Sequence, residues 1–136
     1  MSVFDTIRIA ASGLTAQRLR MDIASSNIAN AQSTHQTNGL PYQAEAVVFE
    51  SVQMGPSEGQ QGVSAVAIVD SSRPPLRVYD PNHPDADARG FVTYPNVDMA
   101  AEMTDIMGAA RSYQLMSTVA QAAKQQALDA LDLGRG

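Results

Sequence analysis

The chain has 136 residues, a net charge of −5 and no cysteine. Its acidic balance argues against nucleic acid and anionic lipid as partners, and the lack of cysteine excludes disulfides, thiolate zinc sites and cysteine nucleophiles. Charged residues interrupt the N-terminal segment, so we expect no secretory signal peptide, and no stretch approaches the ~20 apolar residues of a membrane-spanning helix. We therefore expect no membrane insertion.

Residues 4–30 are predicted to form a first long helix, because they contain no proline and a single glycine. Apolar residues recur every seven positions with small or polar residues between them, the heptad pattern of a helix that packs along one seam. Ser2 and Asp5 predict a capping box at the start, and Asn30 predicts a left-handed end. The heptad positions are Ile7, Leu14, Met21 and Ile28, with Ala10, Gln17 and Ala24 between them.

Residues 32–95 differ in character, because all seven prolines of the chain fall there. Segments rich in β-branched residues and bounded by turn formers predict strands at 45–52, 63–69, 76–79 and 91–94. Asn38 and Gly39 predict a turn. A region of this size is near the lower limit for folding alone, so we expect it to lean on the helices or on neighbouring subunits.

A second long helix is predicted after Pro95, with Asn96 or Asp98 as N-cap, an end near Leu133 and Gly134 as the terminating residue. It would exceed ~50 Å in length. Its seam is predicted at Met99, Met103, Ile106, Ala110, Tyr113, Ser117, Ala120, Lys124, Ala127 and Leu131. A second apolar set, which one partner helix would leave exposed and which therefore predicts association, comprises Met107, Leu115, Val119, Ala122 and Leu128.

These segments predict an α+β fold, in which long terminal helices form a coiled-coil-like core that brackets a small β-rich region. The expected divisions are 1–31, 32–95 and 96–136. An antiparallel helical hairpin in a monomer is the alternative.

Residues 80–87 hold the one candidate for chemistry, a divalent metal site built from Asp80, His83, Asp85 and Asp87, which would make the chain a metal-dependent hydrolase. The alternative is a loop stiffened by proline, in which Asp and Asn side chains accept backbone N–H bonds. We favour the loop and predict neither a metal nor another cofactor, and no small-molecule substrate.

Residues 11–34, ASGLTAQRLRMDIASSNIANAQST, resemble the signature of the bacterial flagellar axial proteins, the family of rod, hook and hook-associated subunits. Three further runs are similar to the proximal-rod members of that family. They are PYQAEAVVFE at 41–50, VYDPNHPDADARGFVTYPNV at 78–97 and EMTDIMGAARSYQ at 102–114. Arg89, Phe91 and the pair Leu115 and Met116 depart from the pattern.

The resemblance implies a structural subunit without catalysis, assembled helically with itself and other rod proteins into the proximal rod of the basal body, which crosses the periplasm. It also implies adjoining basal-body components as partners, and passage through the flagellar type III export apparatus without a cleaved signal. The terminal helices would form the inner core. A soluble adaptor that pairs with one foreign helix is the alternative. The expected assembly residues are Ile7, Leu14, Met21, Asn27, Ile28 and Asn30, with Met103, Ile106, Ala110, Tyr113 and Gln114.

Overall fold

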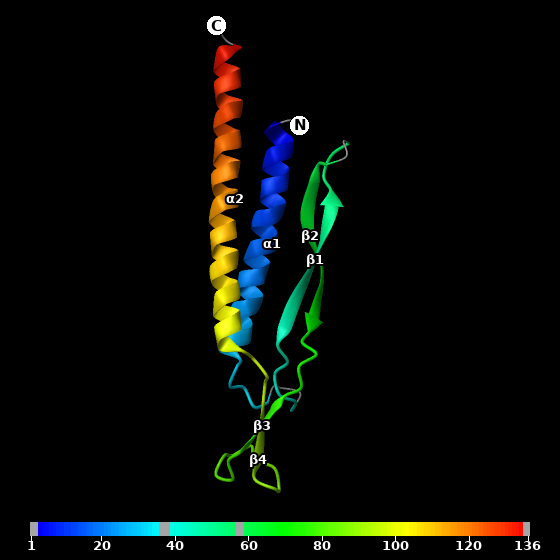
Figure 1. Ribbon diagram of the computed structural model, residues 1–136, viewed down its shortest axis with the longest axis vertical. Coiled ribbons are helices and arrows are strands. Elements are labelled where there is room, and N and C mark those ends of the chain that lie inside the picture. Colours follow the sequence, from blue (N-terminus) through cyan, green and yellow to red (C-terminus); the bar gives the residue numbers. More distant parts are fainter. Residues whose placement is uncertain (1–2, 36–38, 57–58, 135–136) are drawn as a thin grey trace.

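A computed structural model describes residues 3–35, 39–56 and 59–134. Two long helices lie side by side, a long β-hairpin runs along one of them, and a shorter hairpin extends past the other end of the helices (Figure 1). The elements in order are α1 (Val3–Ala29), β1 (Glu45–Gln53), β2 (Gln61–Asp70), β3 (Leu76–Tyr79), β4 (Phe91–Tyr94) and α2 (Met99–Leu133). The α+β prediction is confirmed, and β3 and β4 match the predicted strands at both ends.

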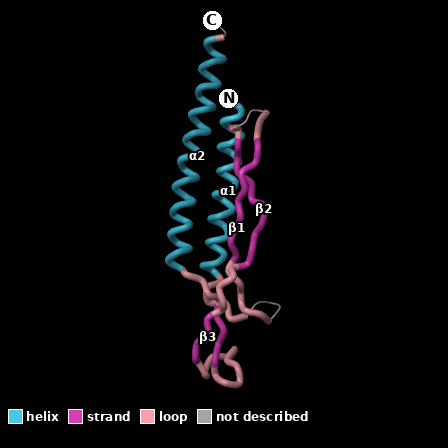
Figure 2. Tube along the Cα trace, turned by 45° about the vertical axis from the view of Figure 1, so that its right-hand side comes forward, coloured by secondary structure: helices cyan, strands magenta, loops and turns pink. Residues whose placement is uncertain are grey.

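Helix α1 is the central layer, with α2 on one side and the β1–β2 hairpin on the other (Figures 1 and 2). Because it is covered on two sides, most of its buried residues are small. Ala10 and Ala24 of the predicted pattern are among them, whereas the four heptad positions themselves are half-buried. Small side chains allow neighbouring backbones to approach closely. The buried residues of α1 are Ala10, Gly13, Ala16, Ile23, Ala24 and Asn27.

The end of α1 differs from the prediction. Among the described residues only glycines have a positive φ, so the expected left-handed Asn30 is wrong. The side-chain N–H of Asn30 instead donates to the carbonyl of Ser26 at 2.9 Å, which satisfies a helix-end acceptor without a left-handed residue. At the other end, Ser2 and the predicted capping box lie outside the described residues.

Strands β1 and β2 pair antiparallel from Glu45 opposite Asp70 to Gln53 opposite Gln61, with a bulge between Val48 and Phe49. Strands β3 and β4 form a separate antiparallel pair, from Leu76 opposite Tyr94 to Tyr79 opposite Phe91. Val92 of β4 is fully buried. Each sheet has only two strands, so their stability depends on what packs against them. Asn38 of the predicted turn lies outside the described residues.

Helix α2 begins at the N-cap Asp98, one of the two predicted candidates, whose Oδ1 accepts the N–H groups of Ala100 and Ala101 at 3.1 Å each. It ends at Leu133, followed by Gly134 as predicted. The predicted seam is only partly correct. Five of its members are half-buried, namely Ile106, Ala110, Ser117, Ala120 and Ala127. The buried residues are instead Ala109 and Ala123, while Lys124 and Leu131 of the seam are exposed. The spacing followed the bulky residues, but the helix packs through its alanines.

Helix α2 has 35 residues and α1 has 27, so about 12 Å of α2 projects beyond the start of α1 (Figure 1). Within the described residues, the element that α2 packs against is α1. Neither helix, over its described residues, is long and apolar enough to cross a membrane.

Candidate assembly interface

The two helices meet through small side chains and one ion pair. A side-chain carbon on Gly13 would overlap the sulfur of Met116, so this glycine is what allows the close approach. Arg20 reaches across to the carboxylate of Asp105, with Nε donating to Oδ2 at 2.8 Å and Nη2 facing Oδ1. Both side chains are partly exposed, so the pair contributes about 0–1 kcal/mol and acts mainly on the register of the helices.

The β1–β2 hairpin is held on α1 by side chains at three points along the helix. Near the start, Asp5 accepts a hydrogen bond from Nε2 of Gln60 at 2.9 Å. About two turns later, the Ser12 hydroxyl accepts the N–H of Val63 at 3.1 Å. At the end of the helix, Asn27 binds the first residue of β1. The hairpin is thus attached over nearly the whole length of α1.

The side-chain amide of Asn27 forms two hydrogen bonds with the backbone of a single residue, as one strand does with the next. Its Nδ2 donates to the carbonyl of Glu45 and its Oδ1 accepts the N–H of the same residue, both at 2.8 Å. The Tyr42 hydroxyl also donates to Oδ1 at 2.9 Å, and burial raises the pKa of this tyrosine. The Asn27 side chain is only 1% exposed, so its amide is used within the chain.

The predicted assembly residues fall into two groups. On α1, Asn27 is buried and the others are half-buried, so these side chains face the interior of the subunit. On α2, Ile106 and Ala110 are half-buried, whereas the rest are exposed, namely Met103, Tyr113 and Gln114. Met103, Tyr113 and Gln114 are the ones most available to a neighbour, and contact between subunits stays a prediction for all of the predicted assembly residues.

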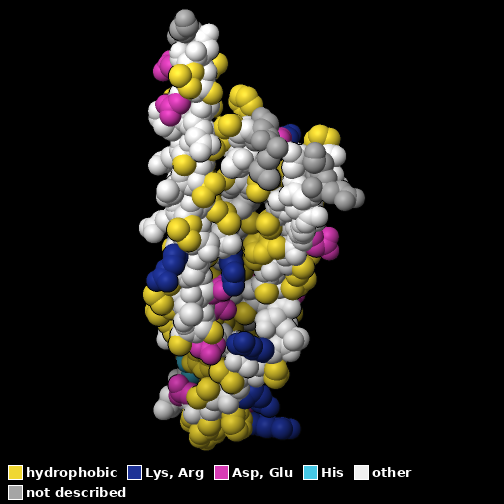
Figure 3. Space-filling model, turned by 45° about the horizontal axis from the view of Figure 1, so that its top comes forward, with side chains coloured by type: hydrophobic (Ala, Val, Ile, Leu, Met, Phe, Trp, Pro, Cys, Tyr) yellow, Lys and Arg dark blue, Asp and Glu magenta, His cyan; other side chains and the backbone are white. Residues whose placement is uncertain are grey.

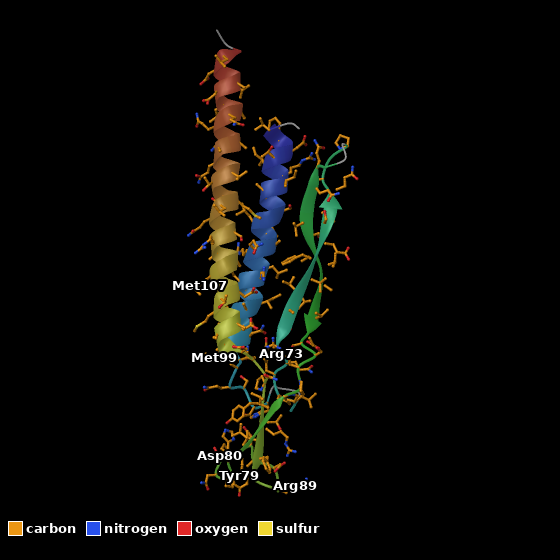
Figure 4. The ribbon with its side chains drawn as sticks, in the orientation of Figure 1. Arg73, Tyr79, Asp80, Arg89, Met99 and Met107 are labelled. Atoms are coloured by element: carbon orange, nitrogen blue, oxygen red, sulfur yellow. The ribbon has the colours of Figure 1, made fainter. Side chains whose placement is uncertain are left out.

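The second apolar set of α2 is exposed, as predicted. Met107 is 65% exposed and Leu115 is 63% exposed, and the other three members, Val119, Ala122 and Leu128, are also exposed. In the side-chain view, Met99 and Met107 lie on the side of α2 away from α1 (Figure 4). Figure 3 shows hydrophobic side chains over much of one face of the molecule.

Sequence reasoning missed apolar surface on the hairpins. Val48, Val66 and Ile68 of the long hairpin are exposed, as are Leu76 and Tyr79 of the short one. A signal was present in the run AVAIV at 65–69, which does not alternate and therefore predicts apolar residues on both faces of the strand.

The acidic side chains of residues 80–87 accept hydrogen bonds within the chain. Asp87 Oδ1 accepts the N–H groups of Arg89 and Phe91 at 2.8 and 3.0 Å, and its Oδ2 accepts from Arg77 at 2.6 Å. Asp85 accepts the hydroxyl of Thr34 at 2.6 Å. The N–H of Phe91 is the main cause that lowers the pKa of Asp87. The hydroxyl of Thr34 is the main cause that lowers the pKa of Asp85.

This geometry supports the interpretation of residues 80–87 as a stiffened loop. Within the described ranges there is no cluster of three or more His, Asp or Glu side chains placed to hold a metal ion.

Known protein families match the two helical parts of the chain. A family model described as flagella basal body rod protein matches residues 7–35, and one described as flagellar basal body rod FlgEFG protein C-terminal matches residues 88–133. The flagellar basal-body rod protein FlgC of Escherichia coli O6:H1 is 42% identical over 135 residues, which cover 99% of this chain and 100% of the relative. The chain belongs to the FlgC family.

The FlgC proteins of Salmonella typhimurium and Bacillus subtilis are 41% and 37% identical, each with 99% of this chain and 100% of the relative covered. As a member of the FlgC family, the chain is a structural component of the flagellar basal-body rod and is located there. It forms the rod together with other basal-body components.

The first family model covers most of α1 and the loop after it, and the second covers β4 and α2. Residues 36–87, which include the long hairpin and β3, lie between the two matches. Full-length similarity to FlgC proteins covers this middle part as well.

Proposed function

We propose that the chain is a non-catalytic subunit that assembles helically, with copies of itself and with other rod proteins, into the proximal rod. In this proposal it contacts adjoining basal-body components, and the flagellar type III apparatus exports it without a cleaved signal. The observation that carries the proposal is the exposed apolar set of α2, because a helix packed on a single partner helix keeps this surface in water unless neighbouring subunits cover it.

The exposed set fits a polymer better than a pair. Its members spread along α2 from Met107 to Leu128, about 30 Å of helix, and do not converge on one pocket. Further exposed apolar side chains lie on both hairpins, outside α2. A subunit that is apolar on several sides meets several neighbours, as a helical assembly requires.

We also propose that residues 1–31 and 96–136 act as the core of the rod and residues 32–95 as its outer part. The α1–α2 packing supports a common core, and the attachment of the long hairpin along α1 supports a rigid link from the core to the outer part.

A charge placed on the exposed apolar set tests the proposal. Leu115→Asp should leave the free energy of unfolding within about 0.5 kcal/mol of the parent chain, because the side chain is already in water. Incorporation into rods should be lost, because a buried, unpaired carboxylate at a subunit contact costs several kcal/mol. The measurements are urea unfolding of the purified chain and the amount of the chain in isolated basal bodies.

Leu115→Met is the matched control, since it keeps an apolar side chain of similar volume at the same exposed position. Normal incorporation of Leu115→Asp would contradict the proposed contact. Light scattering with purified rod proteins separates a polymer from an adaptor, because an adaptor would give a discrete complex. If the chain is exported without a cleaved signal, the protein that an export-competent strain secretes should retain its first residues.

A further inference from the structure

A groove lies between the two layers that cover α1. Helix α2 and strand β1 pack on different sides of α1, and their backbones do not pack on each other over the described residues. The last turns of α1, the start of β1 and the start of α2 come together near one end of the helices (Figures 1 and 2). The hollow between them has a volume of about 340 Å³. We call it the acidic groove and define it by Ile23, Val47 and Phe49 with Glu45, Glu102 and Asp105.

The floor of the acidic groove is apolar. Ile23 of α1 is buried, and Val47 and Phe49 are half-buried at alternate positions of β1. Because the side chains of Ser12 and Asn27 attach the long hairpin to α1, the floor is preformed in the free subunit. It offers a partner an apolar surface that needs no rearrangement.

The carboxylates of the acidic groove are not balanced by cations. Asp105 is paired with Arg20, which also lines the groove. Glu45 and Glu102 are half-buried, and their carboxylates have neither an ion pair nor a hydrogen bond within the described residues. Asp70 lies directly opposite Glu45 in the pairing of β1 with β2, and like charges in such a pair are destabilising.

These acids act on one place in the molecule, although they come from β1, β2 and α2. The buried Tyr42 hydroxyl lies within reach of all of them. Burial is the main cause that raises the pKa of Tyr42, and the negative charges of Glu45, Glu102 and Asp70 raise the pKa further. The free subunit therefore holds a concentrated negative charge beside an apolar floor.

A long cationic side chain is the group that fits such a surface. Lys and Arg lay their methylene stems along apolar surface and keep the charged head among polar groups. The floor suits the stem, and the free carboxylates of Glu45 and Glu102 suit the head. A second copy of this chain is disfavoured as the source, because each copy carries a net charge of −5 and two such chains repel each other.

We propose that the acidic groove binds a basic, amphipathic segment of a different rod protein. One Lys or Arg of that segment lies between Glu45 and Glu102, and its apolar neighbours lie on the floor. The inference rests on the proposed function and names the chemistry of one partner contact. A cation at this position also offsets the repulsion between Glu45 and Asp70, so charges that oppose folding of the free subunit favour the complex.

A photoreactive residue in the groove identifies the occupant. Ala46 is exposed and lines the groove, so p-benzoylphenylalanine at this position should cross-link to a different rod protein when basal bodies are irradiated. Mass spectrometry of the adduct should find a Lys or Arg within about one helical turn of the linked residue. The control is the same photoreactive residue at Ala67, an exposed alanine of β2 outside the groove, which should not link to this segment.

Neutral variants test whether charge selects the partner. Glu45→Gln combined with Glu102→Gln removes both free carboxylates and keeps the shape of the side chains. With the purified chain and the purified rod protein found in the adduct, this double variant should lower the Ala46 cross-linking yield about tenfold. Glu50→Gln, which neutralises an exposed carboxylate of β1 outside the groove, should leave the yield unchanged.

The stability of the double variant separates a binding role from a structural one. Because Glu45→Gln removes the like-charge pair with Asp70, the urea midpoint of the free chain should stay equal to that of the parent or rise. A lower midpoint would assign the carboxylates to the fold of the subunit and contradict the inference.

Four cross-linking results would also overturn it. They are an adduct between two copies of this chain, a linked segment without a cation, a yield at Ala46 no greater than at Ala67, and a yield that the double variant does not change.

The inference and the proposed function fail in different ways. If Leu115→Asp is lost from rods while the Ala46 adduct holds no basic segment of another rod protein, the groove contact is wrong and the proposed function stands. If Leu115→Asp enters rods normally, the α2 contact that carries the proposed function is wrong, whatever the groove binds.

Discussion

At the scale of single residues, Asn27 illustrates how a polar side chain specifies the arrangement of two elements. A buried amide is stable when each of its hydrogen-bonding groups is paired. Here the pairs are the backbone N–H and C=O of Glu45 and the hydroxyl of Tyr42. Because the same residue supplies both backbone groups, the end of α1 is held against the first residue of β1.

Removal of this amide should therefore cost more than removal of a typical surface side chain. Asn27→Ala leaves both backbone groups of Glu45 without their partner, and we expect the free energy of unfolding to fall by about 2–3 kcal/mol. Tyr42→Phe removes the bond to Asn27 and a longer one to Ser26 at 3.5 Å, and should cost about 1 kcal/mol. Urea unfolding measures both, with the exposed neighbour Ser25→Ala as control. A loss for Asn27→Ala no larger than that of the control would show that these bonds do not stabilise the joint.

Asp87 predicts how the short hairpin responds to acid. The backbone N–H of Phe91, the N–H of Arg89 and the charge of Arg77 lower its pKa below the usual value of 3.8. A carboxyl with a lowered pKa contributes stability above its unfolded-state pKa, and this contribution is lost as pH falls through the folded value. The turn should therefore remain intact at pH 5 and loosen only below about pH 3.8.

The amide signals of Arg89 and Phe91 in NMR spectra should report this transition, with a midpoint below 3.8. Asp87→Asn is the control, because the amide oxygen can still accept both N–H bonds while the acid titration at this position is removed. A midpoint at or above 3.8 in the parent chain would contradict the assigned bonds.

At the scale of elements, the sequence was sufficient for the helices and strands and insufficient for their faces. Local signals place the caps and breaks, so the limits of β3, β4 and the end of α2 could be predicted. Which face of a helix is buried depends on its neighbours. The heptad positions of α1 are displaced from the centre of the contact because a hairpin covers the helix from a second side.

The candidate interface was predictable to a similar degree. The exposed set of α2 follows from counting apolar residues beyond those that one partner helix can cover, and this holds from Met107 to Leu128. The internal use of Asn27 was not predictable, because its partner Glu45 lies 18 residues away and no local pattern links them. The edge contact between the rings of Tyr79 and Phe91 depends in the same way on the pairing of β3 with β4.

At the scale of the whole molecule, the layers are not equivalent, because the backbone of the long hairpin packs against α1 and not against α2 over the described residues. Deletion of residues 100–136 should therefore leave β1 and β2 paired, with Asp5, Ser12 and Asn27 still bound to the hairpin. Deletion of residues 1–30 removes all three attachments and leaves a bare two-stranded sheet, which is marginally stable in water. Both truncated chains should be absent from rods.

Hydrogen exchange of the β1 and β2 amides distinguishes the two truncations, with the full-length chain as reference. We expect protection of these amides to be retained without α2 and lost without α1. If both truncated chains retained the protection, the hairpin would be stable by itself. The proposed rigid link between the core helix and the outer part would then be wrong. Loss in both would mean that α1 holds the hairpin only while α2 covers its other side, so that the subunit folds as a single unit and not from α1 outwards.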